Sequence, residues 1–276
     1  MSKCLILPDS AELGTLDKVD TPGAPPPVNL SEIPGFSLLP NESRLGTLEG
    51  VNPPLEALPI HSAEPLVSTL APDSVHDLRG GAIEELRYPS SAALVVAGVP
   101  GAGKSTTLRT FFGAASDVET PRHSPDGATV LDSHQARIRW RRRLWWLPYP
   151  LWRPVVHAAH FHAIHAALRD TTDPVVIHDC ATFRWTRTLI AHWATLYGRD
   201  LHLIMLDVPA TVARAGQYAR GRRVNGVAFT LHVRRWRRLM RTITIERRLP
   251  TNGSRSVVVV DRATVNRMRR VKFVAQ

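Results

Sequence analysis

The sequence predicts an α/β fold, in which a mostly parallel sheet of five strands has helices on both faces. Three observations support this prediction. From residue 88 onward, short apolar runs alternate with helical stretches, a pattern typical of a sheet covered on both sides. A glycine-rich loop directly follows the first apolar run. Residues 1–87 instead combine many prolines with acidic charge and show no sustained periodicity, which indicates an extension in front of one folded domain.

The N-terminal extension, residues 1–87, carries 5 Lys/Arg and 13 Asp/Glu, a net charge of −8, and contains the run Pro25-Pro26-Pro27. Such a segment buries too little apolar surface to offset its chain entropy, so we expect it to be mostly disordered. Residues 88–276 carry the other 30 basic and 11 acidic residues, a net charge of +19, and are long enough for one folded domain. The sequence shows neither a secretory leader nor an apolar run of membrane-spanning length, so we expect a cytoplasmic protein.

The strand expected at Ala92–Ala97 leads into the loop Gly98-Val99-Pro100-Gly101-Ala102-Gly103-Lys104-Ser105. This loop fits the phosphate-binding pattern G-x-x-x-x-G-K-[ST] at every fixed position. Its backbone N–H groups, together with that of Thr106, are expected to surround the phosphates of a nucleotide at the start of a helix. Lys104 would reach the β- and γ-phosphates, and the Ser105 hydroxyl would bind Mg²⁺. The sequence therefore predicts binding of ATP with Mg²⁺, and GTP is the less favoured alternative.

Four further apolar runs predict strands at residues 128–132, 174–179, 201–207 and 256–261. Helical stretches are expected at residues 134–168, with an interruption around residues 148–150 where two prolines lie, and at residues 184–197, 210–219 and 230–241. Ligands of such sheets bind at the carboxyl ends of the strands, where Asp132 and Asp179 lie. We expect Asp179 to hold Mg²⁺, with a helix-capping role as the alternative. Asp132 is expected to accept a proton from the attacking hydroxyl or to bind the acceptor, and again the alternative is a capping acid.

Arginines are concentrated after the fourth predicted strand, and residues 209–241 are interpreted as an arginine-rich lid. Phosphoryl transfer spreads negative charge over the γ-phosphate oxygens, and a mobile arginine can neutralise that charge without occupying the site permanently. Arg220 and Arg222 are the expected catalytic contacts. The alternative is a basic helix face exposed to water.

Two basic tracts, at residues 137–152 and 234–238, interleave arginines with tryptophans. The first lies in residues 134–168, which we interpret as a helical cap and substrate-binding region. Arginine binds phosphates and indole rings stack on bases, so both tracts are also candidate contacts for nucleic acid or another polyanion. An anionic membrane surface would be a further possible partner of the first tract.

The order of these motifs resembles the P-loop kinase superfamily. The resemblance covers residues 90–262 and includes the phosphate loop, the segments 131–137, 176–179 and 206–209, and Arg220-Gly221-Arg222. The most similar members are small AAA-type, zeta-toxin-like and adenylylsulfate-kinase-like ATP-binding proteins. The resemblance implies that Asp132 precedes the substrate helix and that Arg137 touches the acceptor. His134 stands where sulfate-activating kinases have a second acid, which argues against that substrate.

The resemblance implies a Mg²⁺-dependent P-loop NTPase that transfers the γ-phosphate of ATP. The acceptor would be a small molecule, a nucleotide or a nucleic-acid end. Three other functions remain open: an ATPase with nucleic-acid-binding activity, a nucleotide-gated interaction module, and a zeta-like toxin kinase. No signature of ring-forming AAA+ motors is visible in the sequence, so a hexameric motor is not expected.

Overall fold

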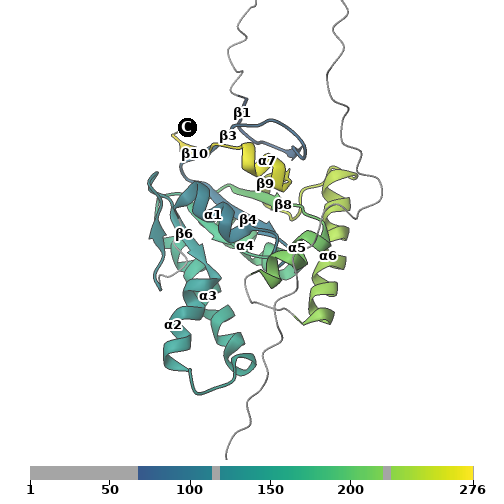
Figure 1. The fold of residues 1–276 in the computed structure, drawn as a ribbon. Coiled ribbons are helices and arrows are strands. Elements are labelled where there is room, and N and C mark those ends of the chain that lie inside the picture. The colour runs from purple at the N-terminus through teal and green to yellow at the C-terminus, as the bar shows by residue number, and fades with distance from the viewer. Residues whose placement is uncertain (1–67, 114–118, 220–224, 276) are drawn as a thin grey trace, which may run out of the picture. The chain divides into compact units, whose positions relative to one another are not determined.

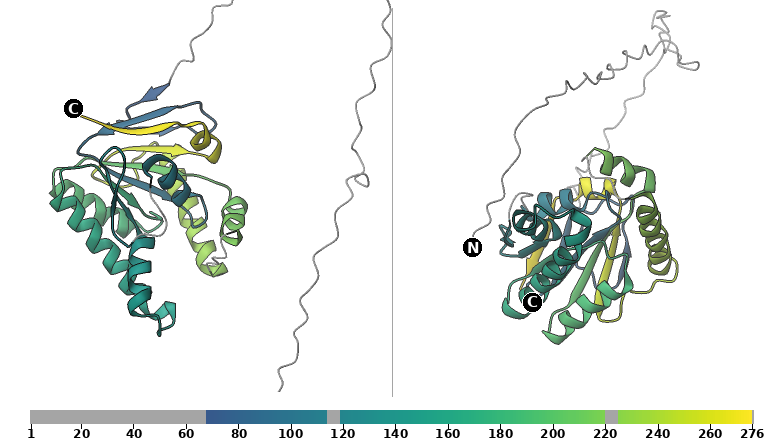
Figure 2. Two further views of the ribbon diagram at one scale, coloured as in Figure 1. Left: turned by 60° about the vertical axis from the view of Figure 1, so that its left-hand side comes forward. Right: turned by 90° about the horizontal axis from the view of Figure 1, so that it is seen from below.

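A computed structural model describes residues 68–113, 119–219 and 225–275 (Figure 1). These residues contain a larger and a smaller sheet with seven α-helices. The larger sheet has the order β2-β9-β8-β4-β7-β6-β5, and the smaller sheet has the order β1-β3-β10. Helices cover both faces of the larger sheet (Figure 2). The predicted α/β class is therefore confirmed.

The five strands expected from the sequence are all present, in the central part of the larger sheet. They are β4 (Ala93–Gly98), β6 (Thr129–Asp132), β7 (Val175–His178), β8 (Leu201–Leu206) and β9 (Ser254–Val260). Neighbours among them all run parallel, in the order β9-β8-β4-β7-β6. The chain leaves β4 toward β6, returns to β7 and then crosses to β8 on the other side of β4. The strand order therefore reverses at β4, where a parallel sheet opens a crevice for ligands.

The central strands are mostly apolar because both of their faces are covered. Every residue of β4 and β8 is buried, and so are Val257–Val260 of β9. This pattern explains why the sequence shows continuous apolar runs here rather than an alternation of apolar and polar residues.

The expected helices are also present. They are α1 (Lys104–Phe112), α2 (Ser133–Arg143), α3 (Tyr149–Asp170), α4 (Arg184–Leu196), α5 (Ala210–Tyr218) and α6 (Gly226–Thr244). The break expected near residues 148–150 separates α2 from α3, and Trp152 and Leu147 join across it through an indole N–H that donates to the Leu147 carbonyl at 3.1 Å. No helix in the described residues is both long and apolar enough to cross a bilayer.

The sheet has more strands than the five expected. Strand β2 (Val75–Asp77) pairs parallel with β9, and β5 (Arg122–His123) pairs antiparallel with β6. Both are edge strands of two or three residues, too short to give a periodic signal in the sequence. The smaller sheet consists of β1 (Thr69–Leu70), β3 (Glu85–Pro89) and β10 (Arg270–Val274), and the short helix α7 (Arg262–Arg267) precedes β10.

The predicted domain boundary at residue 87 is wrong for its last twenty residues. Strands β1 and β2 and the first part of β3 lie before it, and Leu86 of β3 is fully buried. Strands β2 and β3 pair with β9 and β10, which lie almost two hundred residues later in the chain, so no local pattern could reveal these pairings. The buried Glu85 carboxylate of β3 forms an ion pair with the Arg270 guanidinium of β10 at 3.2 Å, in addition to the hydrogen bonds between the two strands. Residues 1–67 lie outside the described part, and their expected disorder stays a prediction.

The revised boundary is testable with Leu86→Ala. Loss of a fully buried leucine should lower the free energy of unfolding by about 2–4 kcal/mol, because it removes apolar contacts and leaves a cavity. Leu196→Ala, at a position 61 % exposed on α4, serves as the control and should cost less than about 1 kcal/mol. Urea unfolding measures both. If both variants lower the free energy of unfolding by the same small amount, residues 68–87 are not part of the folded domain.

Candidate functional site

The glycine-rich loop joins β4 to α1 in a conformation that needs glycine. Gly101 and Gly103 have φ values of 90° and 112°, in the left-handed region that residues with a side chain rarely adopt. Gly103 is the N-cap of α1, so the positive end of the helix dipole faces the loop. A Cβ at Gly103 would meet no atom within 4 Å, which leaves open space directly at the helix N-terminus.

Lys104 is the cationic group of this loop. It is only 5 % exposed, and its ammonium donates to the carbonyl oxygens of Gly98 at 2.7 Å and Val99 at 3.2 Å. The buried ammonium and the helix N–H groups together form a cluster of hydrogen-bond donors with positive charge. Such a cluster fits an anionic polyphosphate. Ser105 is half-buried and Thr106 is exposed, one and two residues further along α1.

Helix α5 packs directly against the back of the loop. A Cβ on Gly101 would lie 2.0 Å from the Ala213 carbonyl oxygen, and one on Gly216 would lie 2.6 Å from the Gly101 carbonyl oxygen. The Gln217 amide donates to the Pro100 carbonyl at 2.8 Å. Two glycines therefore allow the two backbones to touch, and the loop is held by the first helix of the predicted lid region.

The carboxyl ends of β6 and β7 bring Asp132 and His178 together. The strand register pairs these two residues with each other, and His178 with Val96 of β4. His178 Nδ1 lies 2.6 Å from Asp132 Oδ1. The backbone N–H of His134 donates to the same carboxylate at 2.9 Å, and Gln135 completes a capping box at the start of α2. The capping alternative is thus correct for Asp132, and the same carboxylate also pairs with a histidine.

The electrostatics of this pair favour a charged Asp132. Burial alone would raise the pKa of the Asp132 carboxyl, but His178 and the His134 N–H outweigh burial and hold that pKa well below its usual range. Behind the pair, His160 of α3 lies with its Nε2 3.2 Å from the His178 carbonyl oxygen. Burial lowers the pKa of His160 to about 4, so this imidazole is neutral at physiological pH.

Asp179 follows β7 by one residue and lies at the same edge of the sheet. Its Oδ2 accepts from the Ala181 N–H at 2.8 Å and from the Thr186 hydroxyl at 3.3 Å. Ala181 has a φ of 51°, so the turn after β7 contains a left-handed residue other than glycine. The N-cap of α4 is Phe183, and Asp179 instead holds the turn that precedes it. Its expected role as a metal ligand stays a prediction.

The other predicted residues fall into two groups. Arg137 is half-buried, with its guanidinium 4.4 Å from the ring centroid of Tyr149, so it bridges α2 and α3. Its expected contact with the acceptor stays a prediction. Arg220 and Arg222 lie outside the described residues, between α5 and α6, and their expected catalytic role is likewise a prediction.

The tract 137–152 forms most of α2 and the turn into α3. Trp152 is buried, whereas Trp145 and Trp146 are 78 % and 65 % exposed. Helices α2 and α3 extend beyond the sheet at the lower left of Figure 1. One part of the tract therefore packs as the cap interpretation expects, and the other part presents indole rings to solvent. The second tract, residues 234–238, lies on α6.

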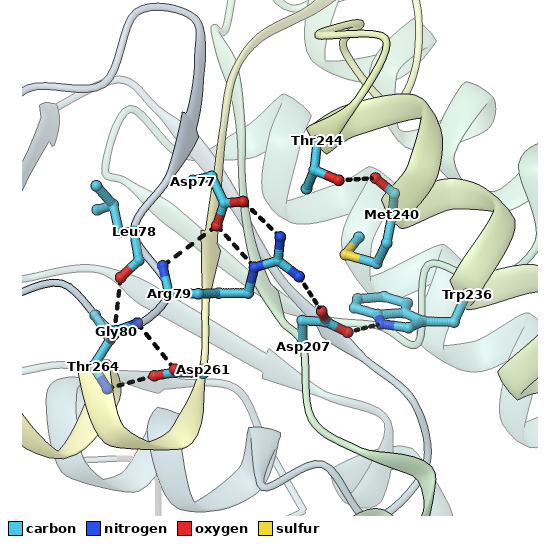
Figure 3. Close-up of polar contacts among 10 residues, drawn as sticks. All are labelled: Asp77, Leu78, Arg79, Gly80, Asp207, Trp236, Met240, Thr244, Asp261 and Thr264. Carbon is cyan, nitrogen blue, oxygen red and sulfur yellow. Dashed lines mark hydrogen bonds and ion pairs between the residues drawn. The ribbon is translucent and has the colours of Figure 1, made fainter.

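Sequence reasoning missed one polar network beside the loop (Figure 3). Arg79, directly after β2, donates to Asp77 at 2.6 Å and to Asp207 at 2.7 Å. Asp207 follows β8 and also accepts from the Trp236 indole N–H of α6 at 2.9 Å. A cavity of 400 Å³ lies here, lined in part by Arg79, Trp236 and Val99 of the glycine-rich loop. The signal that could have revealed the network, an arginine in the supposed extension, was obscured by the acidic charge around it.

Comparison with known proteins identifies the family of this chain. The model of a family described as AAA domain (AAA_33) matches residues 94–245, more than half of the chain. The protein therefore belongs to this family, and the predicted resemblance to P-loop kinases is confirmed. Its fold and family are those of nucleotide-binding kinases and ATPases. No curated protein matches the chain.

Solved structures with a similar fold include a candidate kinase of Chloroflexus aurantiacus J-10-fl. It is 16 % identical, with a TM-score of 0.43, and the match covers 64 % of this chain and 87 % of that one. The PezAT chromosomal toxin–antitoxin system of Streptococcus pneumoniae gives 10 % identity, a TM-score of 0.43 and coverages of 63 % and 70 %. A gluconokinase of Sinorhizobium meliloti 1021 is 17 % identical, with a TM-score of 0.39, and the match covers 66 % of this chain and 89 % of that one.

The contact between α5 and the loop is testable with Gly216→Ala. The added methyl would overlap the Gly101 carbonyl oxygen, so we expect the free energy of unfolding to fall by about 1–3 kcal/mol. Gly226→Ala on α6 is the matched control, because a Cβ there meets nothing within 4 Å. It should be neutral or slightly stabilising. Chemical unfolding of both variants gives the comparison, and equal effects would argue against a backbone contact.

The charge of Asp132 is testable through pH. Because its pKa is depressed in the folded state, the carboxylate stabilises the protein above the ordinary carboxyl pKa of about 4, and this contribution is lost as pH falls further. Asp132→Asn keeps a capping oxygen but removes the charge. We expect it to cost about 2 kcal/mol at pH 7, and the difference from wild type should shrink below pH 4. A difference that stays constant from pH 7 to pH 3 would contradict this assignment.

Proposed function

We propose that this protein is a Mg²⁺-dependent phosphotransferase that moves the γ-phosphate of ATP to a small molecule, a nucleotide or a nucleic-acid end. The observation that carries the proposal is the buried Lys104 ammonium within a glycine loop that is braced from behind by α5. A structural lysine would not need a loop with two left-handed glycines and open space at a helix N-terminus. A triphosphate needs each of these features.

In this proposal the loop residues 98–106 bind the phosphates through their N–H groups, and Lys104 turns from the Gly98 and Val99 carbonyls toward the β- and γ-phosphates. Ser105 and Asp179 are the residues that would hold Mg²⁺, since hydroxyl and carboxylate oxygens are its preferred protein ligands. When bound, Mg²⁺ would neutralise charge on the phosphate oxygens. Arg220 and Arg222 would add positive charge from the segment between α5 and α6.

The acceptor is proposed to bind at the carboxyl ends of β6 and β7. A carboxylate with a depressed pKa is a weak proton acceptor, so Asp132 suits the orientation of an acceptor hydroxyl better than general-base catalysis. The contact at 2.6 Å also fixes the ring of His178, which stands one strand closer to the phosphate loop. Arg137 would complete this region from α2.

Nucleotide binding is tested first, by isothermal titration calorimetry with MgATP and MgGTP. Lys104→Ala should weaken MgATP binding by about 10- to 100-fold, because it removes charge-assisted hydrogen bonds to the phosphates. Lys272→Ala is the control and should bind as wild type does, because this half-buried lysine of β10 pairs with Glu85 at 3.7 Å rather than with the phosphate loop. If the wild-type protein releases no heat with either nucleotide, the proposed function is wrong.

Phosphoryl transfer is tested next, with ATP labelled in the γ-phosphate against a panel of metabolites, nucleotides and oligonucleotides. Asp132→Asn should abolish most of the transfer while leaving the affinity for MgATP unchanged. Label released only as inorganic phosphate when polynucleotide is added would identify the ATPase alternative. Tight binding without either product would identify the nucleotide-gated module.

A further inference from the structure

A basic groove of 1410 Å³ lies between α4, α6 and residues 248–252. Five arginines line it: Arg184, Arg187, Arg235, Arg238 and Arg248. None of the described residues in its lining is acidic. Five like charges around one groove repel one another, and an anionic ligand would relieve that repulsion.

Two of these arginines are fixed in place by neighbouring groups. Arg187 Nε donates to the Pro250 carbonyl at 3.2 Å, and the Arg235 guanidinium lies 4.5 Å from the ring centroid of Phe183. The Nη1 atom of Arg235 is buried and has no hydrogen-bond partner among the described residues. A buried donor without a protein acceptor is unusual, and this one belongs to a residue that lines the groove.

The groove also presents an aromatic surface. Trp185, the second residue of α4, lines it and is 57 % exposed. One side of its indole is supported by Phe161 of α3, with the ring centroids 5.3 Å apart. An exposed indole next to Arg184 combines the two contacts that single strands use, which are base stacking and phosphate pairing.

One wall of the groove is tied to α6 next to its lining. Thr182, which lines the groove and precedes α4, has its hydroxyl 2.7 Å from Nδ1 of His232 on α6. This contact joins the turn before α4 to the helix that supplies Arg235 and Arg238.

We infer that this groove binds single-stranded nucleic acid, with its arginines on the phosphates and Trp185 stacked on a base. The inference goes beyond the proposed function, because such binding requires neither ATP nor phosphoryl transfer. The volume of the groove exceeds that of most small-molecule sites and fits several nucleotides rather than one metabolite.

The test is fluorescence anisotropy of the full chain with a labelled twelve-residue deoxythymidine strand, at 50 to 200 mM salt. A strand of the same length without bases is the matched ligand. Arg184→Gln with Arg238→Gln should weaken binding of both strands and reduce the slope of log affinity against log salt by about 1.4. Trp185→Ala should weaken binding of the deoxythymidine strand by about 5- to 100-fold and leave the abasic strand unaffected.

Arg241→Gln with Arg262→Gln is the control pair, since it removes the same charge from exposed positions that lie outside both basic tracts and do not line the groove. Affinity close to that of wild type supports the groove. If the control pair loses as much affinity as Arg184→Gln with Arg238→Gln, binding depends on diffuse charge and the inference is overturned. If the wild-type protein binds the abasic strand as tightly as the deoxythymidine strand, there is no base contact and the inference is also overturned. Absence of strand binding by a wild-type protein that binds MgATP would overturn it while leaving the proposed function intact.

Discussion

The contact between the glycine-rich loop and α5 is the constraint on which the site depends. The loop can hold its left-handed turn at Gly101 only because no side chain intervenes between it and the Ala213 carbonyl, and Gly216 meets the same requirement from the helix. Lys104 then points into the loop from the first turn of α1, with its stem buried. Helix α5 thus braces the loop from behind, and in the sequence it leads into the arginine-rich segment predicted as a lid.

The sequence was informative where function and local pattern coincide. The phosphate loop, the five central strands and the break between α2 and α3 could all be predicted, because buried parallel strands are continuous apolar runs and because proline and glycine interrupt helices in recognisable ways. The smaller sheet and the edge strand β2 of the larger sheet could not be predicted. Strands β1 and β2 have only two and three residues, and the partners of β3 and β2 include β10 and β9, near the other end of the chain.

The acids at the sheet edge show a different limit of sequence reasoning. Spacing placed Asp132 and Asp179 at strand ends correctly, but it could not decide between capping and chemistry. The structure shows that Asp132 does more than one thing at once, since it caps α2 and pairs with His178. That pairing depends on register between two strands separated by more than forty residues, which no local pattern encodes. The arginine groove was missed for the same reason, because α4 and α6 contribute its charges from distant segments.

Because the tryptophans differ in exposure, their fluorescence should differ with their position in the protein. Trp145 and Trp146 lie in water beyond α2, whereas Trp236 is 2 % exposed and bonded to Asp207 beside the phosphate loop. The former should emit at long wavelength and be open to a soluble quencher such as iodide, and the latter should emit at shorter wavelength and be shielded. A ligand that enters next to Val99 would thus alter the emission of Trp236 and leave that of Trp145 and Trp146 unchanged, so events near the loop can be followed without an attached dye.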